Sequence, residues 1–134
     1  INTEVGRRFP LHAGAASKLL LAYASHDTKM TVLQQPLTRY TPNTIIDPNI
    51  LAKELETIAR QGYAMDKEEY IEGIVAIARP VFGGNGQVIA SLSIPFLATG
   101  NNGSKVAQLL ACLLLTANDI SQAMGHSGSK LTKR

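Results

Sequence analysis

The spacing of apolar residues predicts three helices in the first half of the chain. Residues 13–24 are apolar on more than one side of a helix, and residues 26–35 form a short helix that follows a new N-cap. The third helix has the clearest boundaries, because Asp47 supplies an N-cap, Pro48 stands at the first helical position and Gly62 follows the last turn. Its apolar residues share one face: Leu51, Ala52, Leu55, Ile58 and Ala59.

The second half of the chain changes to a strand pattern. Residues 74–82 are an apolar run rich in β-branched side chains, and residues 83–86 have the glycines and asparagine of a turn. Residues 88–96 then alternate between the two faces of a strand. This order predicts a β-hairpin, with Pro80 at an edge or a bulge because proline cannot donate a ladder hydrogen bond.

A long apolar segment follows the hairpin. Polar residues at 101–104 cap a helix that extends to about Met124, and Gly125 ends it. Helices, then a hairpin, then a helix predict an α+β fold, in which helices pack against an antiparallel sheet. A lone hairpin is marginally stable in water, so the sheet needs further strands that this pattern does not identify. The apolar face of the last helix consists of Val106, Leu109, Leu110, Leu113, Ala117 and Ile120.

Composition predicts where the protein is located and argues against direct binding of this chain to nucleic acid. The 134 residues are 45% hydrophobic and 17% charged, as in a single soluble domain. The apolar stretch 106–117 is shorter than the roughly 20 residues that span a bilayer, and the first residues lack the apolar core of a signal peptide. We therefore expect a cytoplasmic protein without a membrane partner. The net charge of +3 lies in a flexible basic tail, residues 127–134, so the neutral remainder has no footprint for nucleic acid.

The residues that most often carry chemistry do not form a catalytic or metal-binding pattern. Cys112 is the one cysteine, and its apolar neighbours predict a small buried side chain. His12, His26 and His126 have no metal-ligand spacing, and His12 is placed to anchor the first helix. There is no nucleophile elbow and no phosphate-binding loop. The sequence predicts neither an enzyme nor a bound cofactor or metal.

The start of the first helix is a candidate binding surface. Residues 14–17 have almost no side-chain bulk, and their backbone N–H groups are unsatisfied at the helix N-terminus. The positive end of the helix dipole favours a carboxylate at such a position. Small residues also allow a helix to lie close to a sheet, and the sequence alone does not separate these two interpretations.

Two further polar features have both a structural and a functional interpretation. Asp66 and Glu69 have the spacing of a capping box, which is the favoured account from the residues alone. Alternatively, Asp66 accepts a hydrogen bond from a ligand hydroxyl or amide, and any ligand carboxylate then lies at the opposite end. Ser91 and Ser93 fit a half-exposed sheet face, which is the commoner case, or the polar side of a mostly apolar pocket.

Two long blocks of the sequence resemble a known family. They are GRRFPLHAGAASKLLLAYAS and RQGYAMDKEEYIEGIVAIARPVFGGNGQVIASLSI, and they resemble the C-terminal effector-binding domain of IclR-type transcriptional regulators. The likeness extends from Gly6 to the last helix. It implies a GAF-like antiparallel sheet flanked by helices, and an effector-binding domain over residues 1–126 that lacks its first strands. The DNA-binding winged helix-turn-helix of the family is absent from this chain.

The resemblance also implies a binding site for a small organic acid. Ser17 replaces the glycine that usually precedes Lys18, and Pro95-Phe96 replaces a Ser or Ala followed by Gly-Pro. The second departure makes the mouth of the pocket less polar, which favours a larger or aromatic acid over one of two or three carbons. The family's effector-binding positions fall on Gly14, Ala15, Ala16, Asp66, Ala76 and Ser93.

Three classes of function follow from these patterns. The resemblance implies that the intact regulator forms a homodimer or homotetramer and binds operator DNA only through its absent N-terminal domain. The first hypothesis is accordingly a ligand-sensing regulatory domain. The alternative is an oligomerisation module without a small-molecule ligand, because residues 109–115 are apolar on several sides of a helix. A small enzyme is disfavoured for want of a nucleophile and base.

Overall fold

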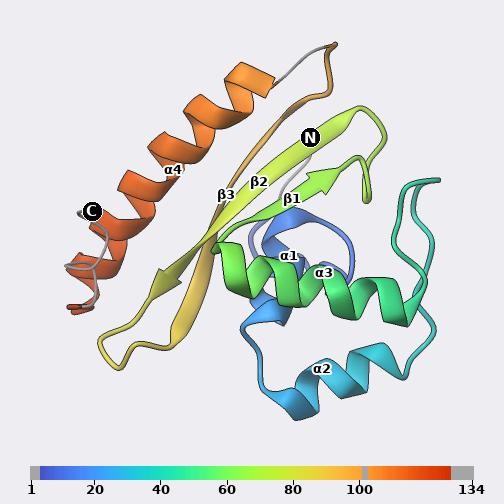
Figure 1. Cartoon of the computed structure of the whole chain (residues 1–134), viewed down its shortest axis with the longest axis horizontal. Coiled ribbons are helices and arrows are strands. Elements are labelled where there is room, and N and C mark those ends of the chain that lie inside the picture. The colour runs from blue at the N-terminus through green and yellow to red at the C-terminus, as the bar shows by residue number, and fades with distance from the viewer. Residues whose placement is uncertain (1–3, 101–102, 128–134) are drawn as a thin grey trace.

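The structure is a computed structural model that describes residues 4–100 and 103–127. Its elements are α1 (Ala15–Ala22), α2 (His26–Leu33), α3 (Pro48–Gln61), β1 (Ala64–Lys67), β2 (Ile74–Phe82), β3 (Val88–Leu97) and α4 (Gly103–Ala123). The strands form one antiparallel sheet in the order β1-β2-β3. Helices α1 to α3 lie on one side of this sheet and α4 lies along the other (Figure 1). The α+β fold with an antiparallel sheet flanked by helices is confirmed.

The helix boundaries follow from local capping. The Ser25 hydroxyl accepts a hydrogen bond from the Thr28 N–H, and the Asp47 carboxylate accepts one from the Asn49 N–H. After α3, Gly62 takes a left-handed conformation with φ of 80°, as a C-cap glycine does. These boundaries agree with the sequence prediction. For α4 the helix begins at Gly103, and residues 101–102 of the expected cap lie outside the described residues.

The sheet contains one strand that the hydrophobic pattern did not predict. Strand β1 is four residues long and pairs with the first half of β2, from Val75 to Ala78. Its sequence, AMDK, is too short and too mixed to show alternation. Because β1 stops opposite Ala78, Pro80 lies where β2 has a neighbour on one side only, beside a register irregularity at Val81/Phe82. The expectation that Pro80 lies at an edge or a bulge is confirmed.

Strand register sorts the side chains onto two different faces. Asp66, Ala76 and Pro95 are cross-strand partners in one row, and cross-strand partners share a face of the sheet. The neighbouring row on that face contains Ala64 of β1 and Ala78 of β2, whose small side chains let α1 approach closely. The core on this side comprises Ala15, Leu19, Leu21, Ala22, Leu51, Leu55, Ile58, Ala64, Ala76 and Ala78.

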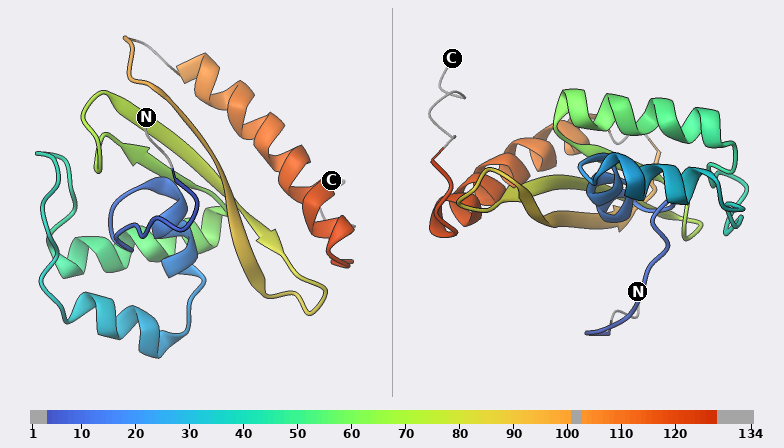
Figure 2. Two further views of the ribbon diagram at one scale, coloured as in Figure 1. Left: turned by 180° about the vertical axis from the view of Figure 1, so that it is seen from behind. Right: turned by 90° about the horizontal axis from the view of Figure 1, so that it is seen from below.

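The opposite face of the sheet packs against α4. Ile77, Phe96 and Leu113 are the buried centre of this second core, and α4 runs along it on the far side from α1 and α3 (Figure 2). Only Leu113, Ala117 and Ser121 of α4 are buried. The other side chains of α4 are partly or largely exposed: Leu109 and Leu110 pack against the core while partly buried, whereas Leu115 is 67% exposed.

The exposure of α4 corrects one sequence prediction. Cys112 is exposed, although its apolar neighbours predicted a buried side chain. The reason is that the sheet covers one narrow side of the helix, so an apolar run that continues around the helix leaves residues in solvent. The whole helix, 21 residues with a mean hydropathy of 1.2 in its most apolar window, meets the length and composition of a membrane span. The sequence prediction considered only the stretch 106–117, which is too short to span a bilayer. One helix of this kind is weak evidence for a membrane span, and here Leu113 packs against the sheet and Ala117 is buried.

Ser121 joins α4 to the end of β2, and its removal gives a measurable prediction. Its hydroxyl donates to the Ala117 carbonyl at 2.8 Å and accepts from the Phe82 N–H at 2.9 Å. Replacing it in Ser121→Ala leaves the strand N–H without a partner, and we expect unfolding free energy to fall by about 1 kcal/mol. Thr116→Ala is the matched control, because among the described residues the Thr116 hydroxyl bonds only within the helix, to the Cys112 carbonyl. Equal losses in denaturant titrations of the two variants would contradict this role.

Candidate ligand-binding pocket

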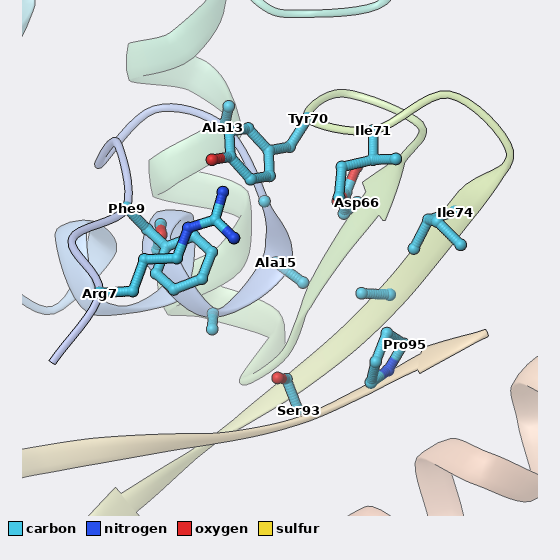
Figure 3. A pocket seen from close by; sticks show the side chains of 14 residues that line it. Arg7, Phe9, Ala13, Ala15, Asp66, Tyr70, Ile71, Ile74, Ser93 and Pro95 are labelled. Atoms are coloured by element: carbon cyan, nitrogen blue, oxygen red, sulfur yellow. The ribbon is translucent and has the colours of Figure 1, made fainter. Parts of the chain in front are cut away.

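A pocket of about 370 Å³ lies between the start of α1 and the sheet (Figure 3). A volume of this size is at the lower end of the range for small-molecule sites. The lining is mostly apolar or small, with few polar groups. It consists of Arg7, Phe9, Ala13, Gly14, Ala15, Ala16, Ser17, Asp66, Tyr70, Ile71, Ile74, Ala76, Ser93 and Pro95.

All six residues that the sequence indicated for effector binding line this pocket. The helix start supplies Gly14, Ala15 and Ala16, and the sheet supplies Asp66, Ala76 and Ser93. The sheet register explains the second group, because Asp66 and Ala76 are direct partners and Ser93 lies one row along on the same face. Ser91, the other serine of the alternating strand, is not among the lining residues.

Gly14 has a backbone conformation that residues with a side chain rarely adopt. It precedes α1 with φ of 98° and ψ of 149°, in a region of backbone space that is almost restricted to glycine. A Cβ built at this position meets nothing within 4 Å, so the need for glycine is conformational and not steric. The Gly14 carbonyl accepts the first helical hydrogen bond, from the Lys18 N–H at 3.1 Å.

The conformation of Gly14 leads to a stability prediction. We expect Gly14→Ala to lower the free energy of unfolding by about 2 kcal/mol, because alanine must adopt a strained backbone or move the start of α1. Gly84→Ala is the control, since Gly84 has no positive φ and its added Cβ would make only ordinary contacts of 3.6 Å or more. Thermal melts of both variants measure the difference. A loss for Gly14→Ala no greater than that of the control would show that the turn relaxes freely.

Asp66 makes the local contact that the sequence favoured, and it also lies at the pocket. Its Oδ1 accepts a hydrogen bond from the Glu69 N–H at 2.7 Å, and the residue also lines the pocket while only 5% exposed. Burial raises the pKa of the Asp66 carboxyl, and the Glu69 N–H and the Lys18 ammonium oppose that rise. Among the described residues, the Glu69 side chain makes no return hydrogen bond of the kind a capping box has, because it binds Lys18 instead.

Lys18 is a buried cation to which the sequence had assigned no role. Its ammonium group is fully buried and donates to the Met65 carbonyl at 2.7 Å, to Glu69 at 2.9 Å and to Glu54 at 3.0 Å. These bonds tie α1 to α3, to β1 and to the β1–β2 connection. Burial raises the pKa of the Glu69 carboxyl, and the charge of Lys18 and its hydrogen bond oppose the rise. The signal in the sequence was a lysine followed directly by three leucines.

A second set of hydrogen bonds fixes the β1–β2 connection beside the pocket. The Thr41 and Thr44 hydroxyls donate to the Glu68 and Glu69 carbonyls, both at 2.6 Å. Glu68 has a positive φ of 60°, which is uncommon for a residue with a side chain. These contacts define the path of the loop that carries Tyr70 into the pocket wall.

Aromatic residues line the side of the pocket that the sequence did not indicate. The Phe9 ring packs edge-on against Tyr70, with centroids 5.8 Å apart, and Tyr70 packs against Tyr40 at 5.1 Å. His12 is buried and its Nε2–H donates to the Thr38 carbonyl at 2.7 Å, which anchors the segment before α1 as expected. The contact of Phe9 with Tyr70 joins segments far apart in sequence, so no local pattern could have found it. Among the described residues there is no group of three or more potential metal ligands.

The chain thus combines an α+β fold with a mostly apolar pocket beneath the start of a helix. Residues 1–122 match the family model of the bacterial transcriptional regulator IclR C-terminal domain. The chain therefore belongs to the family of IclR C-terminal domains. This is a family of transcriptional regulators and not of enzymes, as the sequence predicted.

Three relatives illustrate the similarity. The chain is 35% identical over 122 residues to the HTH-type transcriptional repressor AllR of Escherichia coli, a match that covers 90% of this chain and 45% of AllR. The C-terminal domain of the E. coli regulator KdgR has a TM-score of 0.83 and 38% identity, over 90% of this chain and 74% of that one. The chain thus spans about half the length of AllR.

The third relative was solved with a small molecule. It is a double mutant of the inducer-binding domain of the PobR transcription factor from Acinetobacter, in complex with 3-hydroxybenzoic acid. Its TM-score is 0.80 at 29% identity, over 88% of this chain and 69% of that one.

Proposed function

We propose that this domain senses a small organic acid, which binds in the pocket between α1 and the sheet. The ligand carboxylate lies towards the start of α1, where unsatisfied N–H groups and the helix dipole favour a negative charge. A hydroxyl or amide at the other end of the ligand donates to Asp66. The observation that carries this proposal is the lining of one pocket by the helix start, by Asp66 and by Ser93.

The size and the lining of the pocket favour an aromatic or similarly large acid. A volume of about 370 Å³ leaves most of the space empty around an acid of two or three carbons. Phe9, Tyr70 and Pro95 offer apolar surface to a planar ring. The complex of PobR with 3-hydroxybenzoic acid is consistent with this size class. We expect hydroxybenzoates to bind more tightly than pyruvate or glyoxylate, and the reverse order would overturn the size argument.

In the intact regulator, binding of the acid would shift the equilibrium between two states of the protein. A ligand does so only through a difference in its affinity for the two states. Operator DNA would be bound by a part of the regulator outside this chain, in a cytoplasmic homodimer or homotetramer, while residues 1–126 form the effector-binding domain. The relatives that carry the HTH-type designation support this arrangement.

A thermal-shift panel tests the sensing function directly. The panel contains hydroxybenzoates, simple aromatic acids, sugar acids and short keto acids. A ligand at about 100 times its Kd stabilises the folded state by about 2.7 kcal/mol, which raises the melting temperature by several degrees in a domain of this size. The proposal predicts such a shift for at least one acid, confirmed by calorimetric titration. No shift with any acid would contradict it.

An oligomerisation module remains the second candidate, and the exposed side of α4 favours it. Leu115 and Met124 are 67% and 54% exposed, which leaves apolar surface available to another subunit. This function predicts a melting temperature that rises with protein concentration and does not respond to acids. Sedimentation over a wide range of concentrations, with and without the acid panel, separates the two functions.

A further inference from the structure

Among the described residues that line the pocket, Arg7 and Asp66 are the two charged ones. They come from different parts of the chain, since Arg7 belongs to the extended segment before α1 and Asp66 to β1. Most of the remaining lining is apolar, including Phe9, Ile74 and Pro95. The pocket therefore has one positive group and one negative group in an otherwise apolar setting.

The position of Arg7 is defined by aromatic packing. Its guanidinium carbon lies 5.4 Å from the centroid of the Phe9 ring, and Phe9 in turn packs against Tyr70 of the β1–β2 connection. Figure 3 shows the Arg7 side chain extending across Phe9 at the pocket, while Asp66 enters from the strand. A guanidinium can stack on a ring with its face and bind a carboxylate with its edge at the same time. Arg7 is thus held where it can meet a ligand.

We propose that Arg7 determines specificity in this pocket by pairing with the carboxylate of an acid whose far end donates a hydrogen bond to Asp66. The inference rests on the proposed function, because it names the class of ligand and the residue that selects it. The class is a hydroxy- or amino-substituted aromatic acid. A plain acid would leave Asp66 buried without a donor from the ligand, and a neutral ester would offer Arg7 no carboxylate to bind.

The placement of the two charges fixes the direction of the ligand. A carboxylate beside Asp66 would meet a like charge, whereas beside Arg7 it meets an opposite one. The buried carboxylate of Asp66 then faces the hydroxyl or amino substituent. Arginine is suited to this task because its planar fork matches the two oxygens of a carboxylate.

The neighbouring Arg8 offers a matched control. Arg7 and Arg8 are both exposed arginines of the same extended segment, but only Arg7 lines the pocket. Substitution to glutamine at either position removes one positive charge and keeps a polar side chain of similar length. Any general effect of net charge on binding an acid will therefore be the same in Arg7→Gln and Arg8→Gln.

Three probes separate the two ends of the ligand: 3-hydroxybenzoate, benzoate and methyl 3-hydroxybenzoate. For the wild-type domain we expect 3-hydroxybenzoate to bind most tightly. Arg7→Gln should weaken binding of 3-hydroxybenzoate about tenfold, the value of one charge-assisted hydrogen bond, and leave the Kd of the methyl ester within about twofold. Arg8→Gln should leave both within about twofold. The salt dependence of 3-hydroxybenzoate binding should decrease in Arg7→Gln only.

Isothermal titration of the three proteins with the three probes gives distinct outcomes. If 3-hydroxybenzoate binds and the two arginine variants lose affinity equally, or not at all, the role of Arg7 is wrong while the sensing function stands. The same conclusion follows if the ester loses as much affinity as the acid in Arg7→Gln. If none of the probes binds the wild-type domain, the ligand class proposed here is wrong, and the wider acid panel decides whether the sensing function fails with it.

Discussion

Replacing Lys18 with methionine is expected to lower the free energy of unfolding by about 3–5 kcal/mol, a large share of the stability of a small domain. The variant leaves the Glu69 carboxylate buried without the ammonium that binds it at 2.9 Å. The Glu69 Oε2 atom already has no hydrogen-bond partner among the described residues, so no second donor replaces the lost one. Chemical denaturation measures the loss. Lys53→Met on the exposed side of α3 is the control and should change stability by less than about 0.5 kcal/mol.

Partner variants test whether the loss comes from the unpaired charge. Glu54 is partly exposed, and Glu54→Gln should therefore cost less than about 1 kcal/mol. The double variant Lys18→Met/Glu69→Leu removes both buried charges, and we expect it to recover most of the stability lost in Lys18→Met, because an apolar pair of similar volume often substitutes for a buried ion pair. A double variant as unstable as Lys18→Met would instead assign the loss to packing.

The pH dependence of Lys18→Met has a defined sign. Burial raises the pKa of Glu69 in the folded state, and removing Lys18 raises it further because the opposing charge is gone. A group with a raised folded pKa contributes stability that is fully present below its unfolded pKa and is lost as pH rises through the folded pKa. The deficit of Lys18→Met relative to wild type should therefore shrink as pH falls towards the ordinary glutamate value of 4.5. A deficit that is constant with pH would contradict the role of the Glu69 charge.

Replacing Asp66 with asparagine is expected to weaken binding of a hydroxy acid about 10- to 100-fold while leaving the free domain folded. In the wild type the Glu69 N–H donates to Asp66 Oδ1 at 2.7 Å, and the side-chain oxygen of asparagine can accept the same hydrogen bond. The substitution removes the negative charge that would accept strongly from a ligand hydroxyl. Calorimetric titration gives the loss of affinity. Glu72→Gln is the control, because Glu72 is an exposed acid of the same loop that does not line the pocket.

Stability measurements separate the structural and the binding roles of Asp66. Burial raises the pKa of this carboxyl, so its charged form reduces stability at neutral pH compared with acid. Asp66→Asn removes that penalty. We expect the melting temperature of the free variant at neutral pH to equal or exceed that of the wild type, and the difference to disappear as pH falls towards 3.8. A variant that is destabilised at neutral pH would make the contact with Glu69 the main role of Asp66.

The elements with strong local signals were predictable from the sequence. Helix α3 has an N-cap, a proline and a C-cap glycine in register with its apolar face, and the hairpin has a turn between two strand patterns. Strand β1 was missed because its four residues are held by pairing with β2 and not by their own alternation. Cys112 was assigned to the core because the apolar run does not reveal how little of α4 the sheet covers.

The same distinction applies to the candidate site: local patterns indicated some of its residues, and tertiary contacts bring in the others. The row of Asp66, Ala76 and Pro95 follows once the sheet register is known, and the helix start was visible as a run of small residues. Arg7 and Phe9 reach the pocket through an extended segment, whose path depends on contacts with Tyr70 far away in the sequence. The ion pair of Lys18 with Glu69 likewise joins residues 51 positions apart. Tertiary proximity of this kind leaves no trace in a local pattern.

The most direct test of the sensing function is a two-dimensional amide NMR titration of the domain with the tightest acid from the panel. The account predicts saturable shifts of the Gly14, Ala15 and Ala16 amides, whose backbone lines the pocket, together with Asp66, and little change along the exposed side of α4 around Leu115. Shifts confined to α4, or no saturable shift with any acid, would contradict the claim that the pocket beneath α1 is an effector site.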